Sequence, residues 1–330
     1  MHRLPILTNL TIPMRRTLTT LVCSSMLLML WGCGAEPAPI SSHDSLHEDT
    51  VYSTDSIPDA FLYDLDAPSA TFGLPAVLEE ISALAISTDS RRLYAVQDEA
   101  GVIFELSPTE GKIVGRYPFH KDGDYEGIAM VGDTVYVLKS TGTLYRVTGL
   151  GTPQQQRTKY KTDLLSRAND TEGLTYDAAR HRLLIACKSK PGNGDLRTKA
   201  IYSFDLASRT YEPTPAYTLS LDSIRRYIDL SPAVRRIEKV RNFFTNDNGT
   251  LTFSPSSIAI HPTTGDIYLL SSVGKLLVVI NPAGQVLHIS KLDKRIHRQP
   301  EGMTFDRYGN LYISNEAKDA TAKLHVFRRR

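Results

Sequence analysis

The sequence predicts an all-β fold of repeated sheets, because one six-residue phrase recurs at a nearly constant interval and short alternating strands fill each interval. The phrase reads Tyr-Glu-Gly-Ile-Ala-Met at residues 125–130, where a polar second residue precedes an apolar strand. Copies follow at steps of about 45 residues, with one step nearly twice as long, and this period is typical of a β-propeller blade. Five copies predict a five-bladed β-propeller, while the long step leaves a six-bladed alternative open. The copies lie at residues 81–86, 125–130, 171–176, 255–260 and 300–305.

The first repeat shows the expected strands of one blade in order. Residues 83–87 form an inner strand, and a polar turn follows them. Three further apolar stretches at residues 93–97, 101–106 and 113–117 are separated by turn-forming residues, which predicts a four-stranded antiparallel sheet. The last repeat is shorter than the others and ends soon after residue 327. We therefore expect Phe61–Leu65 to complete its sheet, because a propeller that borrows a strand from the other terminus has no open edge.

The long step between the third and fourth repeats predicts a helical insertion. Ser231 and Pro232 suit an N-cap and a first helical turn, and Val234, Ile237 and Val240 follow at helical spacing. The insertion is rich in basic residues, which indicates either a solvated helix face or a contact with lipid headgroups or another anionic ligand. These basic residues are Arg225, Arg226, Arg235, Arg236, Lys239 and Arg241.

The N-terminus has the features of a bacterial lipoprotein signal. Arg15 and Arg16 precede an apolar run that is too short to span a membrane and that ends in small residues before Cys33. Residues 1–33 are therefore the expected signal segment, with Cys33 lipidated, and the polar residues 34–59 are the expected flexible tether of a propeller at residues 60–330. Gly34 is not an inner-membrane retention residue, which favours the outer membrane of the cell envelope.

Charge and cysteine content restrict the possible partners. The full chain has 38 basic and 36 acidic residues, and three of the basic residues lie in the expected signal segment. A nearly neutral domain of this kind is not expected to bind nucleic acid. Cys187 is the one cysteine after Cys33 and lies within an apolar stretch, so no disulfide is expected.

The second residue of each copy is the candidate for a shared site. Equivalent residues of all blades meet around one axis, so Glu126, Glu172 and Glu301 are expected to converge with Ser82 and Ser256. Three carboxylates held close together must take up protons or be offset by a cation. Oxygen ligands without a thiol or paired histidines favour a hard ion, calcium before magnesium. The alternative is that the glutamates line a wet channel and bind nothing.

The hairpins between second and third strands are expected to open on the same face as these five residues. They add further candidates to the mouth of the channel, most of them acidic, while Lys139 and Lys188 oppose the negative field. The candidates at the mouth are Asp98, Glu99, Asp124, Asn315 and Glu316.

The chain resembles the SdiA-regulated family of bacterial envelope propellers, which is distantly similar to NHL-repeat proteins. The resemblance rests on four phrases in register: Glu-Ile-Ser-Ala-Leu at residues 80–84, Gly-Asp-Tyr-Glu-Gly-Ile at 123–128, Thr-Glu-Gly-Leu at 171–174 and Gln-Pro-Glu-Gly-Met at 299–303. It covers roughly residues 60–330 and implies a five-bladed propeller with a bound calcium ion and no established enzymatic reaction. The basic helical insertion departs from the family pattern.

Together these features predict a membrane-tethered, calcium-binding propeller that binds an unknown ligand or protein partner without catalysis. The alternative is a calcium-dependent hydrolase of lactones or phosphate esters, in which the ion is a Lewis acid and His120 or His297 is the base. A third possibility is an ion that only stabilises the fold. The sequence has no Gly-x-Ser-x-Gly motif for nucleophilic catalysis.

Overall fold

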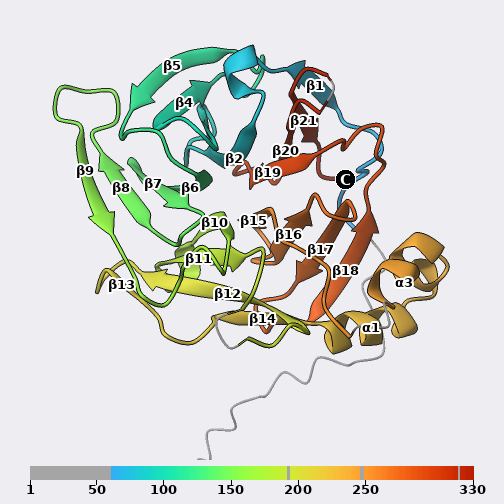
Figure 1. Ribbon diagram of the computed structural model, residues 1–330. Helices are drawn as coiled ribbons and strands as arrows, with labels where there is room; N and C mark the ends of the chain where they lie inside the picture. The colour runs from blue at the N-terminus through green and yellow to red at the C-terminus, as the bar shows by residue number, and fades with distance from the viewer. Residues whose placement is uncertain (1–60, 192–193, 246–248, 319) are drawn as a thin grey trace, which may run out of the picture. The chain divides into compact units, whose positions relative to one another are not determined.

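Five antiparallel sheets surround a common axis in the computed structural model, which confirms the five-bladed propeller (Figure 1). The structure describes residues 61–330 except 192–193, 246–248 and 319, so the expected signal segment, Cys33 and the tether fall outside the described residues. The described residues belong to one compact unit.

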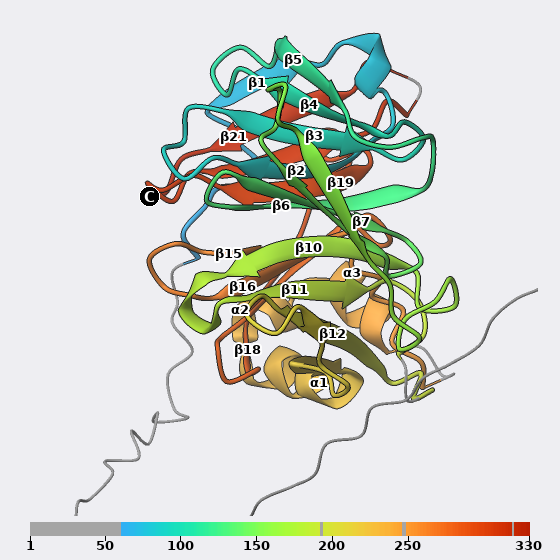
Figure 2. The ribbon, with the colours of Figure 1, turned by 90° about the vertical axis from the view of Figure 1, so that its left-hand side faces the viewer.

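The blades follow one another along the chain, and the first strand of each blade lies innermost (Figures 1 and 2). We call them blades A to E. Blade A is β2 (Ile81–Ile86), β3 (Leu93–Gln97), β4 (Val102–Leu106) and β5 (Ile113–Pro118), and blade B is β6 (Tyr125–Val131), β7 (Thr134–Lys139), β8 (Leu144–Thr148) and β9 (Gln156–Tyr160). Blade C is β10 (Thr171–Asp177), β11 (Arg182–Cys187), β12 (Thr198–Asp205), β13 (Thr210–Tyr211) and β14 (Tyr217–Ser220). Blade D is β15 (Ser257–Ile260), β16 (Ile267–Ser271), β17 (Leu276–Ile280) and β18 (Val286–Lys291), and blade E is β19 (Pro300–Phe305), β20 (Leu311–Asn315), β21 (Lys323–Phe327) and β1 (Ala70–Gly73). Short 3-10 turns lie at η1 (Ala76–Leu78) and η2 (Ala178–Arg180).

Blade E is closed by an N-terminal strand, but the predicted strand was wrong. Strand β1, not Phe61–Leu65, pairs with β21 along Ala70–Gly73. The earlier segment packs its side chains into the core between blades D and E, where Tyr63 is 3% exposed and donates a hydrogen bond to the Gly309 carbonyl at 2.6 Å. Its aromatic and aliphatic residues are therefore buried by packing, without strand pairing.

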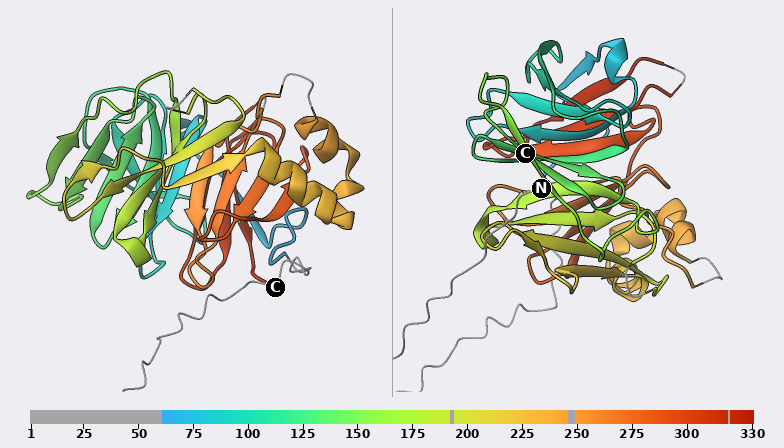
Figure 3. Two further views of the ribbon diagram at one scale, coloured as in Figure 1. Left: turned by 90° about the horizontal axis from the view of Figure 1, so that it is seen from below. Right: turned by 60° about the vertical axis from the view of Figure 1, so that its left-hand side comes forward.

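The helical insertion connects blade C to blade D. It consists of α1 (Leu221–Leu230), α2 (Pro232–Arg235) and α3 (Glu238–Phe244), with the break at Ser231 as the sequence predicts. The Ser231 hydroxyl accepts a hydrogen bond from the Val234 amide and caps α2. The helices lie at the outer edge of blade D, and their apolar faces are buried in one core cluster with that blade (Figure 3). No helix of the described residues is long and apolar enough to cross a membrane.

Adjacent innermost strands approach closely just after the ring residue of three blades. A Cβ atom added to Gly127 would lie 2.7 Å from Leu174 of blade C, and one on Gly173 would lie 2.8 Å from Ile258 of blade D. The same atom on Gly302 would lie 2.9 Å from Leu84 of blade A. Glycine is required here because side-chain atoms of the next blade leave no room for a Cβ atom, and at Gly173 and Gly302 a backbone nitrogen of that blade also lies within 3.0 Å.

We predict that Gly173→Ala destabilises the fold by about 1–3 kcal/mol, because the added methyl group also lies 3.0 Å from the Ile258 backbone nitrogen, which cannot move without shifting strand β15. Gly73→Ala in β1 is the control, since its new Cβ would meet no atom closer than 3.8 Å. Urea unfolding measures both. Equal stability of the two variants would contradict the close approach of the blades.

Candidate functional site at the channel mouth

A β-bulge presents the ring residue in four of the five blades. The strand register shifts at Ser82, Glu126, Glu172 and Glu301, each just inside the start of an innermost strand. A bulged residue leaves the hydrogen-bond ladder and its side chain is redirected. In blade D, Ser256 precedes β15 directly. In four blades the repeated phrase therefore marks a local distortion that redirects the side chain of the ring residue.

The two ring serines connect neighbouring blades. The Ser82 hydroxyl donates to the Tyr125 carbonyl at 2.7 Å, and the Ser256 hydroxyl donates to the Pro300 carbonyl at 3.0 Å. Both acceptors belong to the following blade and come directly before a ring glutamate. The serines thus stabilise the ring, and their role as metal ligands stays a prediction.

The three ring glutamates are mutually coupled. Glu172 and Glu301 are 6% and 8% exposed. Burial, with the Glu172 and Asp124 carboxylates, raises the pKa of Glu126 to about 10. Burial and Glu301 raise the pKa of Glu172 to about 8, although Lys188 opposes this, and burial also raises the pKa of Glu301. The glutamates therefore share one poorly solvated region, as the sequence predicts, and ionisation of one disfavours ionisation of the next.

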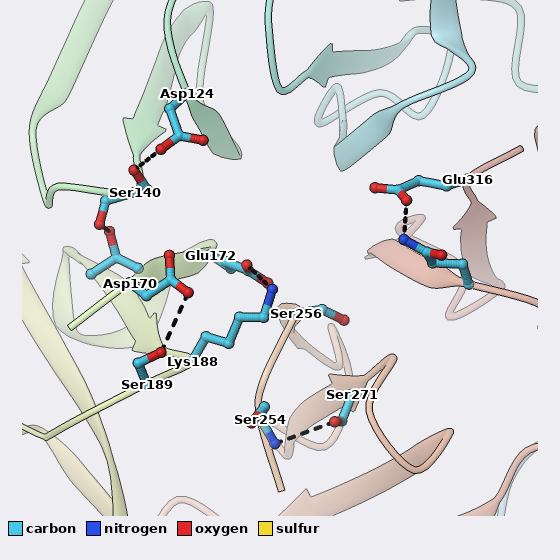
Figure 4. A network of polar contacts seen from close by, with 12 residues as sticks. Asp124, Ser140, Asp170, Glu172, Lys188, Ser189, Ser254, Ser256, Ser271 and Glu316 are labelled. Atoms are coloured by element: carbon cyan, nitrogen blue, oxygen red, sulfur yellow. Dashed lines mark hydrogen bonds and ion pairs between the residues drawn. The ribbon is translucent and has the colours of Figure 1, made fainter. Parts of the chain in front are cut away.

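One ring glutamate already has a cationic partner. Lys188, just after β11, donates a hydrogen bond to Glu172 in a largely buried ion pair (Figure 4). The pKa of Lys188 is raised, because the attraction of Glu172 outweighs burial. The buried Lys199 side chain donates to the Lys188 carbonyl at 2.7 Å and to the Ser189 carbonyl at 3.1 Å. Lys199 thus fixes the loop that presents the Lys188 ammonium.

A second tier of side chains lies two residues before the ring position. Its members pair with the mouth hairpin of their own blade: Asp124 accepts from Ser140, Asp170 from Ser189 at 3.4 Å, and Gln299 donates to Glu316 (Figure 4). The sequence analysis missed Asp170 and also missed Glu80, the equivalent residue of blade A. Comparing the residue two positions before each ring residue would have found both.

Blade A brings two acids together where blades B, C and E pair an acid with a neutral group. Burial and the neighbouring Glu80 carboxylate raise the pKa of Asp98 to about 6. The Oδ1 atom of Asp98 is buried and has no hydrogen-bond partner among the described residues. Burial and the Glu301 and Asp98 carboxylates raise the pKa of Glu316 to about 8. This side of the mouth carries negative charge that no lysine offsets by direct contact.

The remaining mouth candidates lie in different surroundings. Glu99 is exposed, while Asn315 is 2% exposed, and neither polar atom of the Asn315 side chain has a hydrogen-bond partner among the described residues. Lys139 lies over the ring of Tyr125, with its ammonium 5.3 Å from the ring centroid.

The residues considered for catalysis make contacts that stabilise the fold. His297 is completely buried, with its Nε2 atom 2.9 Å from the Leu65 carbonyl and its ring stacked on Phe327. His120 contacts Arg157 and packs against the ring of Tyr145. Burial of Cys187 raises the pKa of its thiol to about 12. These contacts give the hydrolase alternative no specific support.

The innermost strands also line a cavity beyond the ring residues. It has a volume of about 160 Å³ and is lined by residues of all five innermost strands, among them Leu84, Ile128, Leu174, Ile258 and Thr304.

The donor atoms suit a hard cation, but the side chains are not yet arranged around one. No three acidic, histidine or cysteine side chains of the described residues are grouped so that they could hold a metal ion. The carboxyl groups have the chemistry that calcium prefers. Within the described part of the chain, Glu172 is ion-paired with Lys188, whereas Glu126 makes no ion pair. Calcium would fit this donor set once Lys188 leaves Glu172 and the carboxyl groups turn toward a common point.

The fold and the site define a class: a five-bladed propeller with a ring of coupled, buried carboxyl groups at one channel mouth. The SdiA-regulated family model matches residues 64–318, and the chain belongs to this family.

Several solved structures are similar to this chain. A Myxococcus xanthus glutaminyl cyclase has 13% identity and a TM-score of 0.49, with 80% of this chain and 95% of that chain covered. A chain of a nidogen/laminin complex has 17% identity and a TM-score of 0.42, with coverage of 71% and 72%. A virginiamycin B lyase from Staphylococcus aureus has 14% identity and a TM-score of 0.40, with coverage of 75% and 67%.

We predict that Glu126→Gln stabilises the calcium-free protein progressively as pH rises. The ordinary pKa of 4.5 applies to the unfolded chain, whereas the folded carboxyl has a pKa of about 10. Between these values the folded state binds more protons, so the wild type loses stability with rising pH and the neutral amide does not. Urea unfolding in chelator from pH 5 to pH 9 measures the difference. Glu99→Gln is the exposed control, and a Glu126→Gln difference that stays constant with pH would contradict this pKa.

Proposed function

We propose that this protein is a binding module of the bacterial cell envelope, anchored to a membrane through lipid on Cys33, whose channel mouth binds calcium. The ion is held by the carboxyl groups of Glu126, Glu172 and Glu301, and through it or beside it the mouth takes a ligand or protein partner. The module carries out no catalysis. The coupling of the ring glutamates carries this proposal, because burial raises the pKa of all three, Glu126 lies in the field of Glu172, and Glu172 lies in the field of Glu301.

A bound cation would offset the repulsion between the ring carboxylates, which the calcium-free protein reduces by protonating them. Glu126 keeps its proton at neutral pH, because burial and the Glu172 and Asp124 carboxylates disfavour its anion. A bound divalent ion supplies positive charge directly to the carboxyl oxygens, so the three glutamates can be ionised together. The serines and second-tier side chains hold the ring in place around it.

Lys188 is the internal competitor of this ion. Its ammonium occupies Glu172, so a cation must displace it before Glu172 can act as a ligand. The released lysine then faces the mouth, next to whatever binds there. Through Lys188, cation binding at the ring would therefore change the charge of the surface that a ligand contacts.

We predict that calcium raises the midpoint of thermal unfolding saturably after chelator treatment, because an ion that binds the folded state stabilises it by mass action. Circular dichroism follows the transition. Glu126→Gln is expected to remove the response. Lys188→Met is expected to tighten calcium binding by about 10- to 100-fold, since a charge-assisted hydrogen bond of about 1.5–3 kcal/mol no longer competes.

Lys139→Met is the matched control, because Lys139 also lies at the mouth but stacks on Tyr125. It should leave the calcium response unchanged. A midpoint that ignores calcium in the wild type, in Lys188→Met and in the control would rule out the ring as a calcium site. A response shared by the wild type and Glu126→Gln would place the ion elsewhere.

A further inference from the structure

The outer surface of the helical insertion carries cations that the fold does not neutralise. Five exposed side chains are involved, and none of them makes an ion pair or a side-chain hydrogen bond within the described part of the chain; they are Arg226, Arg235, Arg236, Lys239 and Arg241. Their neighbours differ: Arg225 donates to the Phe244 carbonyl at 3.0 Å, and Arg197 pairs with Asp222. The five cations give the surface of the insertion positive charge, which favours an anionic partner.

Two exposed apolar side chains belong to the same helical insertion. Leu230, at the end of α1, is 58% exposed, and Ile237, between α2 and α3, is 37% exposed. The opposite faces of the helices are buried against blade D through Ile224, Val240 and other residues of the same core cluster. The insertion is therefore already anchored to the propeller, and its outward apolar groups are not needed for that anchoring.

The insertion lies on the same blade as the point where the described chain begins. Helix α1 packs against β18 at the edge of blade D (Figure 1). The ring of Phe61, the first described residue, stacks on His288 of β18 with 4.0 Å between centroids. A flexible polar chain of the length of residues 34–60 has a mean end-to-end distance of about 30 Å. A lipid at Cys33 would thus keep blade D within reach of the membrane surface.

We infer that the outer face of helices α1 to α3 binds the surface of an anionic phospholipid bilayer. Clustered arginine and lysine side chains are attracted to anionic headgroups, and Leu230 and Ile237 enter the boundary between headgroups and acyl chains. This surface is distinct from the channel mouth and contains none of its residues. It orients the propeller on the membrane instead of leaving it free at the end of a tether.

The test uses residues 53–330, the compact unit, so that no lipid anchor contributes to binding. Co-sedimentation with vesicles of phosphatidylglycerol and phosphatidylcholine in equal parts is compared with pure phosphatidylcholine vesicles. We expect binding only to the anionic vesicles, weakened by salt. Replacing all five cations with glutamine should lower the partition constant at least about tenfold. Leu230→Ser should lower it without any change of charge.

The control replaces five other exposed cations with glutamine: Arg116, Lys159, Lys161, Arg328 and Arg329. It should bind within about twofold of the unchanged protein. Equal loss in both five-fold variants would show general electrostatic attraction and overturn the assignment. Absence of binding to anionic vesicles would overturn it as well. Binding to heparin as tight as to vesicles, and unaffected by Leu230→Ser, would replace the bilayer with a soluble polyanion.

Discussion

The five innermost strands approach one another so closely at the channel mouth that three blades leave no room for a side chain after the ring residue. Gly127, Gly173 and Gly302 meet the next blade at these positions. The β-bulge that accommodates this approach also turns the preceding residue out of the ladder and toward the axis. One steric constraint thus accounts for the three Glu-Gly pairs and for the convergence of the glutamates, while the bulge at Ser82 is followed by Ala83 and not by a glycine.

Electrostatics at the mouth follow from this convergence. The bulges gather carboxyl groups in a poorly solvated region, so their negative charges must be reduced. The molecule does this differently on its two sides. Lys188 neutralises Glu172, whereas burial and neighbouring carboxylates raise the pKa values of Asp98 in blade A and Glu126 in blade B. Because, among the ring carboxyl groups, only Glu172 of blade C is paired with a lysine of the described residues, the carboxyl groups of blades A and B have the greater need for an external cation.

The repeated phrase made the fold and the ring residues predictable from the sequence. Individual side-chain contacts could not be predicted in this way. The constant period located all five ring residues, and Ser231 with Pro232 located the break in the insertion. Phe61–Leu65 was mistaken for the closing strand because hydrophobic sequence cannot distinguish burial by packing from burial by pairing. The Glu172–Lys188 pair depends on how a hairpin crosses the mouth, which local sequence does not specify.

The central claim is that the ring holds protons in place of a cation, and proton release on calcium binding tests it most directly. Calorimetric titration at pH 7 in two buffers of different ionisation enthalpy gives the number of protons released. The account predicts saturable binding with a net release of protons, because Glu126 ionises as the ion enters. Saturable binding at the ring without proton release would show that its carboxyl groups were already ionised and would contradict the account.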